Sequence, residues 1–347
     1  MSMVAPIPQV HSVHLVLRDG LPASAGNRIT ADRLRRALAG LGATVFLHEV
    51  AELRDQPPPG PGSVVHALHA IRAGLPALDW AAGAPVVWTF TGTDLDPDEC
   101  RALQGLAPDA VAACVAYHEA ARDDIAACLP ELAPRIHIIP PGVAVPATPA
   151  RNAAPAADVV LLLPAGLRPI KEPDRALAVV AGLAARGIAA RLWIVGPARD
   201  AAFTQAFLDR AAATGHTTYL GEVPHSDMDA LYAQATLVLN TSRMEGLSNA
   251  VLEAMAAGCP VLATDIPGNR AAIRHGVDGW LCPPEELTAA ALQLCADAPL
   301  RTRLAAAARQ SVAHRFSVTA EAEAHLRLYQ SLIPTRDLCG KSGDRPH

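Results

Sequence analysis

The carboxylates of Glu245 and Glu253 could bind one ligand together, because seven residues separate them across the expected start of a helix. The apolar run 236–240 before them is typical of a buried strand, and Ser248 or Asn249 can cap the helix that follows. Ligands of open α/β sheets bind at the carboxyl ends of strands, where helix N-termini hold phosphate. The pattern therefore predicts a site for a sugar joined to a diphosphate.

The residues between these glutamates are expected to bind the ligand through the main chain. Gly246 has no Cβ, so a ligand can approach its backbone closely. The backbone groups expected to hold sugar and phosphate beside Glu245 are those of Leu247, Ser248 and Asn249. Glu253, about one turn into the helix, could grip the vicinal diol of a ribose. Two solvated glutamates are the alternative, which the surrounding strand, glycine loop and helix disfavour.

Arg168 and Lys171 are two cations that follow another expected strand, 159–163, again at its carboxyl end. Departure of a diphosphate builds negative charge on its oxygen, and a metal or fixed cations can stabilise that charge. Each charge-assisted hydrogen bond of this kind contributes about 1.5–3 kcal/mol. The forked guanidinium of Arg168 can bind two oxygens at once. A solvated pair of loop residues is the alternative.

The run Asp94-Leu-Asp96 resembles an Asp-x-Asp metal motif. However, Asp96 precedes Pro97 and, three residues on, Glu99, which is typical of the first positions of a helix. Capping is therefore the favoured role, and no carboxylate or histidine cluster stands at ligand spacing elsewhere. The sequence predicts no metal site and no cofactor beyond a nucleotide-bound substrate.

Strand-like and helix-like runs alternate in two blocks, which predicts parallel sheets covered on both faces. The expected strands are 13–17, 44–50, 64–68, 86–90, 110–117 and 136–139, then 159–163, 192–195, 218–220, 237–240 and 261–263. A Pro/Ala-rich stretch, 146–157, separates the blocks. The predicted fold class is α/β, with two doubly wound, Rossmann-like domains, 1–150 and 151–316, that face a cleft. A helical segment, 317–334, follows them.

Three residues of the first block are further candidates for binding the donor or the acceptor. His69 ends an expected strand on the cleft side, where a neutral imidazole could donate to a sugar hydroxyl or to an acceptor. A packed or surface histidine is the alternative. Gly26 and Asn27, in the first strand–helix loop, would approach the donor phosphates or the acceptor from the opposite side; a simple turn is the alternative.

Composition excludes several classes of protein. The net charge of -5, without a basic tract, argues against nucleic acid as the main partner. The seven cysteines are odd in number, widely spaced and without a C-x-x-C, which favours reduced thiols in a cytoplasmic protein. The first residues do not resemble a signal peptide, and no apolar run is long enough to span a bilayer. We therefore expect no integral membrane association.

The motifs of the second block resemble the retaining glycosyltransferases of family 4, which have the GT-B fold. The resemblance is strongest over residues 158–285 and looser over the N-terminal half. Within that family, the subgroup called glycosyltransferase 1 domain-containing protein 1 looks most similar at 166–173, 194–197 and 266–269. A weaker likeness, to the selenosugar synthases of selenoneine biosynthesis, covers 25–28, Leu68-His69 with Arg72, and 91–94.

The resemblance to family 4 implies roles for individual residues. An arginine and a lysine at the positions of Arg168 and Lys171 contact the donor pyrophosphate in that family, and Val223 would meet the base through its main chain. The last helix would cross back onto the first domain. Thr91 stands where many members carry a histidine near the anomeric centre, so a mechanism cannot be transferred whole.

These patterns together predict a retaining glycosyltransferase that moves a hexose-type sugar from a nucleoside diphosphate, expected to be UDP, to a small-molecule acceptor. Retention and a front-face substitution follow from the resemblance alone. Three alternatives stay open: a selenosugar or thiosugar synthase with a selenium or sulfur nucleophile, a GT-B epimerase or hydrolase of nucleotide sugars, and a non-catalytic sugar-nucleotide binding protein. The intact set of Arg168, Lys171, Glu245 and Glu253 disfavours the last one. The acceptor cannot be named from the sequence.

Overall fold

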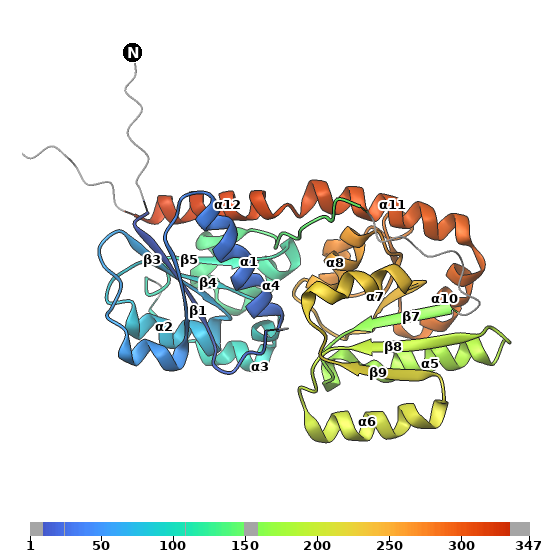
Figure 1. The fold of residues 1–347 in the computed structure, drawn as a ribbon. Helices are drawn as coiled ribbons and strands as arrows, with labels where there is room; N and C mark the ends of the chain where they lie inside the picture. Colours follow the sequence, from blue (N-terminus) through green and yellow to red (C-terminus); the bar gives the residue numbers. More distant parts are fainter. Residues whose placement is uncertain (1–9, 24, 108, 149–158, 334–347) are drawn as a thin grey trace, which may run out of the picture.

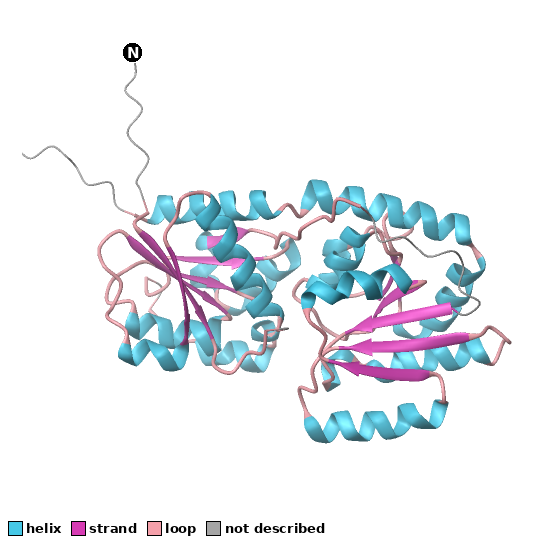
Figure 2. Ribbon diagram, in the orientation of Figure 1, coloured by secondary structure: helices cyan, strands magenta, loops and turns pink. Residues whose placement is uncertain are grey.

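The computed structural model describes residues 10–23, 25–107, 109–148 and 159–333 of the chain. They form two α/β domains, and two consecutive helices, α11 and α12, run along one side of both (Figure 1). Helices pack around each sheet (Figure 2). The α/β class with two parallel sheets is confirmed. The predicted boundary at residues 150 and 151 lies outside the described residues.

The N-terminal sheet has the strand order β2-β1-β3-β4-β5-β6, and every neighbouring pair is parallel. Its strands are β1 (Ser12–Leu17), β2 (Val45–Glu49), β3 (Ser63–Leu68), β4 (Val86–Thr89), β5 (Ala113–Ala116) and β6 (Ile136–Ile138). Its α-helices are α1 (Gly26–Gly40), α2 (Leu75–Trp80), α3 (Pro97–Cys100) and α4 (Glu119–Cys128). The interior strands β3, β4 and β5 are buried throughout, as expected of parallel strands that are covered on both faces.

The C-terminal sheet has the order β12-β11-β10-β7-β8-β9, again with parallel pairs only. Its strands are β7 (Val159–Pro164), β8 (Ala190–Val195), β9 (Thr217–Gly221), β10 (Leu237–Asn240), β11 (Val261–Thr264) and β12 (Trp280–Cys282). Its helices begin with α5 (Pro173–Ala184), α6 (Ala201–Thr214), α7 (Met228–Gln234) and α8 (Asn249–Ala257). They continue with α9 (Pro267–Ala272), α10 (Leu287–Ala296) and α11 (Ala298–Arg315). The sequence prediction missed β12, because three residues are too few to show a periodicity.

The last helix, α12 (Val318–Leu332), packs on the N-terminal domain although it follows the C-terminal one (Figure 1). The Tyr329 hydroxyl lies 2.6 Å from Nδ1 of His66 in β3. The buried carboxylate of Glu321 accepts bonds from Nε of Arg33 (3.2 Å) and from the Gly142 amide (2.9 Å). Loss of one partner of such a buried pair costs about 3–5 kcal/mol. None of the described helices is both long and apolar enough to cross a membrane.

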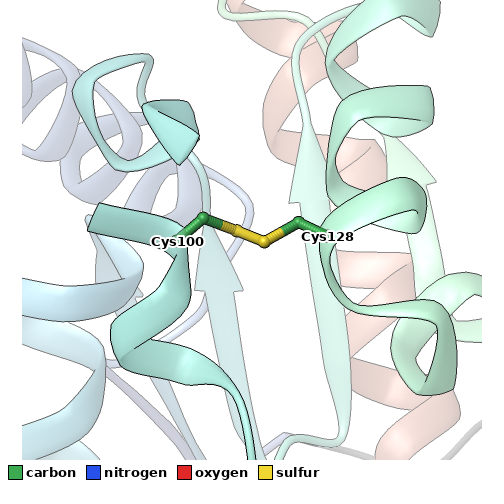
Figure 3. Close-up of a disulfide and its surroundings, with 2 residues drawn as sticks. All are labelled: Cys100 and Cys128. Atoms are coloured by element: carbon green, nitrogen blue, oxygen red, sulfur yellow. A yellow bond between two sulfur atoms is a disulfide. The ribbon is translucent and has the colours of Figure 1, made fainter. Parts of the chain in front are cut away.

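The cysteines differ from the prediction at one pair. Cys100 at the end of α3 and Cys128 at the end of α4 form a disulfide (Figure 3), so the expectation of reduced cysteines throughout is wrong for these two. They are 28 residues apart, and only the path of the chain through β5 brings them together. The cysteine argument for a reducing compartment is thereby removed, and the cytoplasmic location stays a prediction. Cys339 lies outside the described residues.

The free thiols are chemically quiet. Burial raises the pKa of Cys114 and of Cys259 to about 12, and that of Cys295 to about 11. Thiolates are the reactive form of cysteine, so these residues serve packing.

Candidate active site

A cavity of about 830 Å³ opens between the two domains, lined by loops at the carboxyl ends of both sheets. Its C-terminal wall consists of the loops after β7, β8, β9 and β10 and the start of α8. Its N-terminal wall consists of the loops after β1, β3 and β4 and the start of α1. The predicted site residues that line it are Gly26, Asn27, His69, Arg168, Lys171, Val223, Glu245, Leu247, Ser248, Asn249 and Glu253. Gly246 is the exception among those predicted.

Glu245 follows β10, and one of its oxygens is held by three donors. Oε1 accepts hydrogen bonds from Nζ of Lys171 (2.6 Å), Oγ of Ser242 (2.6 Å) and Nδ2 of Asn240 (3.1 Å). Burial alone would raise the pKa of Glu245, but the charge of Lys171 and these hydrogen bonds outweigh it and lower the pKa. Glu245 is therefore a fixed carboxylate.

The same contacts join the two loops of the C-terminal wall. The Lys171–Glu245 ion pair links the loop after β7 to the loop after β10, with side chains only 14% and 10% exposed. The Thr241 hydroxyl donates to the Lys171 carbonyl at 2.8 Å, and the Arg243 amide donates to the Ile170 carbonyl at 2.9 Å. Lys171 and Glu245 are thus held in place by contacts within the protein.

Glu253 lies in the second turn of α8 and is bonded far less. Among the described residues, its Oε2 accepts only a long bond from the Tyr232 hydroxyl, at 3.5 Å, and its Oε1 is 4.0 Å from Nδ1 of His225. Burial raises the pKa of Glu253, although His225, Arg33 and the Tyr232 hydroxyl act in the opposite direction. A carboxylate with unused lone pairs on a cavity wall suits two hydroxyl donors on adjacent carbons.

The first turn of α8 lies at the cavity. Ser248 is its N-cap residue in extended conformation, and the Ser248 side chain makes no capping hydrogen bond to the helix. The first backbone N–H groups and the positive end of the helix dipole are therefore offered to an anion. The Asn249 side chain instead joins the domains, because its Nδ2 donates to the Gly26 carbonyl (3.2 Å) and to the Thr30 hydroxyl (3.1 Å).

Gly246 has a different role from the one predicted. A Cβ at Gly246 would lie 2.6 Å from the carbonyl oxygen of Thr91, and one at Gly92 would lie 2.6 Å from the Gly246 amide. The Gly246 carbonyl is also 2.7 Å from Nε2 of His118. Because Gly246 has no side chain, the loop after β4 of the other domain packs against its backbone. The sequence predicted a ligand in that position.

Asp94 organises the N-terminal wall. One carboxylate oxygen accepts from the amides of Thr91 (2.8 Å) and Gly92 (2.9 Å), and the other accepts from the Ala70 amide (3.0 Å). Asp94 is fully buried. Helix α3 begins at Pro97, directly after Asp96, as the capping pattern predicts. In the described ranges, no group of three or more His, Cys, Asp or Glu residues is arranged to hold a metal ion.

His69 is held in a strained backbone conformation at the end of β3, with φ 102°. Its Nδ1 accepts the Arg72 amide at 3.3 Å and lies 3.7 Å from the Asp94 carboxylate. Burial lowers the pKa of His69, against the opposing charge of Asp94. The ring is therefore neutral, and its proton is on Nε2.

Three cations of the cavity were missed by the sequence prediction: Arg18, Arg72 and Arg199. Each stands shortly after a strand, namely β1, β3 and β8, so the rule that found Arg168 could have found them. Burial, followed by the charges of neighbouring arginines, lowers the pKa of Arg18 and Arg199. Cations that repel one another around one cavity are stabilised by an anion.

Comparison with known proteins identifies the class. Residues 158–297 match the family model described as Glycosyl transferases group 1. The match covers most of the C-terminal domain, and the two parallel sheets have the arrangement of GT-B glycosyltransferase structures, as the motifs predicted.

Among its relatives is Glycosyltransferase 1 domain-containing protein 1 of Xenopus tropicalis, which is 28% identical over 341 residues. That match covers 90% of this chain and 95% of the relative, and it confirms the predicted subgroup likeness. A D-inositol 3-phosphate glycosyltransferase of Nocardia farcinica is 31% identical over 216 residues, 57% of this chain and 48% of that protein. The chain thus spans about half the length of that enzyme.

Two solved structures share the fold at low sequence identity. HepE of Anabaena, in complex with UDP and glucose, has a TM-score of 0.75 and 17% identity, covering 92% of this chain and 100% of that one. Sucrose-phosphate synthase of Thermosynechococcus elongatus has a TM-score of 0.74 and 16% identity, covering 92% and 98%.

Proposed function

We propose that this chain is a retaining glycosyltransferase of family 4 that moves a hexose from UDP to a small-molecule acceptor, without a metal ion. The observation that carries the proposal is the C-terminal wall. There a fixed carboxylate, a carboxylate with unused lone pairs and an uncapped helix N-terminus line one cavity together with Arg168. The UDP and glucose named for the HepE complex support this choice of donor.

Each part of the donor is assigned to its own group. Glu253 accepts hydrogen bonds from the two ribose hydroxyls, and the main chain of Val223, after β9, contacts the base. The diphosphate lies between the start of α8 and the guanidinium of Arg168, where both bring positive charge. Glu245, held by Lys171, accepts hydrogen bonds from hydroxyls of the hexose.

The reaction breaks the bond between the anomeric carbon and the phosphate oxygen and forms a bond from that carbon to the acceptor. The acceptor enters on the face that UDP leaves, and its proton goes to the departing phosphate oxygen, which preserves the anomeric configuration. Arg168, Lys171 and the α8 N-terminus stabilise the leaving charge. His69 and Asn27 lie on the opposite wall, where they orient the acceptor.

A panel of nucleotide sugars tests the proposal. Thermal shifts with UDP-, GDP- and ADP-sugars should be largest for a UDP-hexose, and mass spectrometry with candidate acceptors should show a hexosyl product. Proton NMR of the product should then show the same anomeric configuration as in the donor. An inverted product would overturn retention. Free or isomerised sugar formed without acceptor would establish the hydrolase or epimerase alternative, and transfer to selenophosphate but not to alcohols would establish the selenosugar alternative.

A further inference from the structure

Arg18 is a cation of the N-terminal wall to which the donor assignment gives no role. It follows β1 directly and is half-buried at the cavity. Within the described residues its side chain bonds only to the neighbouring Asp19 carbonyl, at a long 3.4 Å, and forms no ion pair. A half-buried guanidinium at a cavity wall, without a carboxylate partner among the described residues, is available to an anionic group of a ligand.

The carboxylates of Asp19, in the loop after β1, and of Glu49, at the end of β2, are engaged elsewhere. Asp19 accepts the Ala51 amide at 2.7 Å, on the side of β2. Glu49 accepts the Gly20 amide at 3.1 Å and pairs with Arg28 at 3.0 Å. These contacts fix the course of the loop after β1 and keep both acids away from the arginine. The fold thus builds the loop and leaves Arg18 uncompensated.

The donor assignment places the charges of the diphosphate on the C-terminal wall, although Arg18 is close enough to Arg168 and Arg199 for their charges to interact. The diphosphate of a nucleotide sugar carries about two negative charges, and the C-terminal wall offers Arg168, Arg199 and the start of α8 to it. Neither Arg168 nor Arg199 has a carboxylate within ion-pair distance among the described residues. On the N-terminal wall, Arg72 also lines the cavity, although it is 49% exposed and pairs with Glu99 at 2.8 Å.

We propose that Arg18, assisted by Arg72, binds an oxyanion of the acceptor, so that the acceptor is a small molecule with a phosphoryl or carboxylate group. The inference rests on the proposed function, because it assigns the C-terminal wall to the donor. It specifies the substrate class, since a neutral sugar or alcohol would leave Arg18 without a counter-charge.

Calorimetry on the 347-residue chain tests this proposal in two steps. UDP is titrated first, and inorganic phosphate or acetate is then titrated into the UDP-saturated protein. Wild type should bind one of these probes with UDP present. Arg18→Gln should weaken that binding at least tenfold and change the UDP affinity less than about twofold, and Arg72→Gln should weaken the probe about threefold. Arg54→Gln removes the same charge from an exposed site outside the cavity and should change neither.

The outcomes separate the two proposals. Absence of UDP binding to wild type would overturn the proposed function, and the inference with it. UDP binding with no probe bound, or with equal probe binding by Arg18→Gln, would overturn the inference alone. A tenfold loss of UDP affinity in Arg18→Gln would show that Arg18 binds the donor, and it would also overturn the inference.

Binding of phosphate supports an acceptor with a phosphoryl group, and binding of acetate supports an acceptor with a carboxylate. If Arg18→Gln does not fold, Arg18→Lys, which keeps the charge and loses the fork, should weaken the probe at least threefold; unchanged binding would contradict the proposal.

Discussion

The two walls of the cavity are built in different ways. The C-terminal wall takes its main side chains from two short stretches, 168–171 and 245–253, and bonds them directly to each other through Lys171 and Glu245. The N-terminal wall is assembled from loops far apart in the chain, which carry Arg18, His69 and Thr91. The buried carboxylate of Asp94 holds two of these loops through three backbone amides.

The difference fits the ligands proposed for the two walls. A diphosphate and a ribose need the same few groups in every donor, so a strand, a turn and a helix start can supply them locally. An acceptor pocket is shaped by packing between distant loops, and its conformation depends on strain such as that at His69. Substitutions in the two walls should therefore fail in different ways.

Glu245→Gln should have the largest effect. We expect kcat to fall about 100-fold, equal to about 2.7 kcal/mol of transition-state stabilisation. We also expect a lower melting temperature, because Lys171 would lose its buried partner at a cost of about 3 kcal/mol. Steady-state kinetics and calorimetric melting measure both. Glu286→Gln, an exposed substitution, is the control. Wild-type turnover of Glu245→Gln would remove Glu245 from the site.

Asp94→Asn should break the N-terminal wall and spare the C-terminal one. An amide cannot accept all three backbone N–H groups, so the loops after β3 and β4 should loosen. Turnover should drop about 30-fold, or about 2 kcal/mol, while the UDP affinity stays within about threefold. Asp79→Asn, exposed on α2, controls for the lost charge. An equal loss of UDP binding would show that the walls are not independent.

The predicted residues of both walls line the cavity except Gly246, whereas three arginines were missed, Arg18 and Arg72 on the N-terminal wall and Arg199 on the C-terminal wall. Glu253 and Arg168 belong to contiguous motifs, whose periodicity and turn residues fix their place at a sheet edge. Arg18 follows β1 directly, so the rule that found Arg168 could have found it, but its lack of a carboxylate partner among the described residues depends on Asp19 and Glu49 being engaged elsewhere. The Cys100–Cys128 pairing likewise depends on the tertiary path of the chain.

The fold was predicted more completely than the site. Continuous apolar runs located the strands of both parallel sheets except β12, because buried strands of this kind need no contact information. Gly246 shows the limit of such reasoning. Its need for a small residue was correct, but its close neighbour is Thr91 of the other domain, which only the domain contact reveals.

Glu253→Gln should have a smaller effect that depends on pH. Its carboxylate must be ionised to accept two ribose hydroxyls, and burial raises its pKa. Wild-type UDP affinity should thus fall as the pH drops toward that raised pKa, whereas the variant should be about tenfold weaker above it and show little pH dependence. The raised pKa also means that ionised Glu253 destabilises the fold as the pH rises through that range, so the variant should melt no lower than wild type there. A steep pH dependence retained in the variant would contradict the assignment.

Calorimetric titration of UDP into the wild-type protein, with and without EDTA, tests the central claim most directly. The claim is that the C-terminal wall holds a nucleoside diphosphate through Arg168, Glu253 and the start of α8, with no metal ion. We predict one UDP per chain with the same affinity in both buffers, and an affinity about tenfold weaker in Arg168→Gln. The absence of UDP binding, its loss in EDTA, or unchanged affinity in Arg168→Gln would contradict the account.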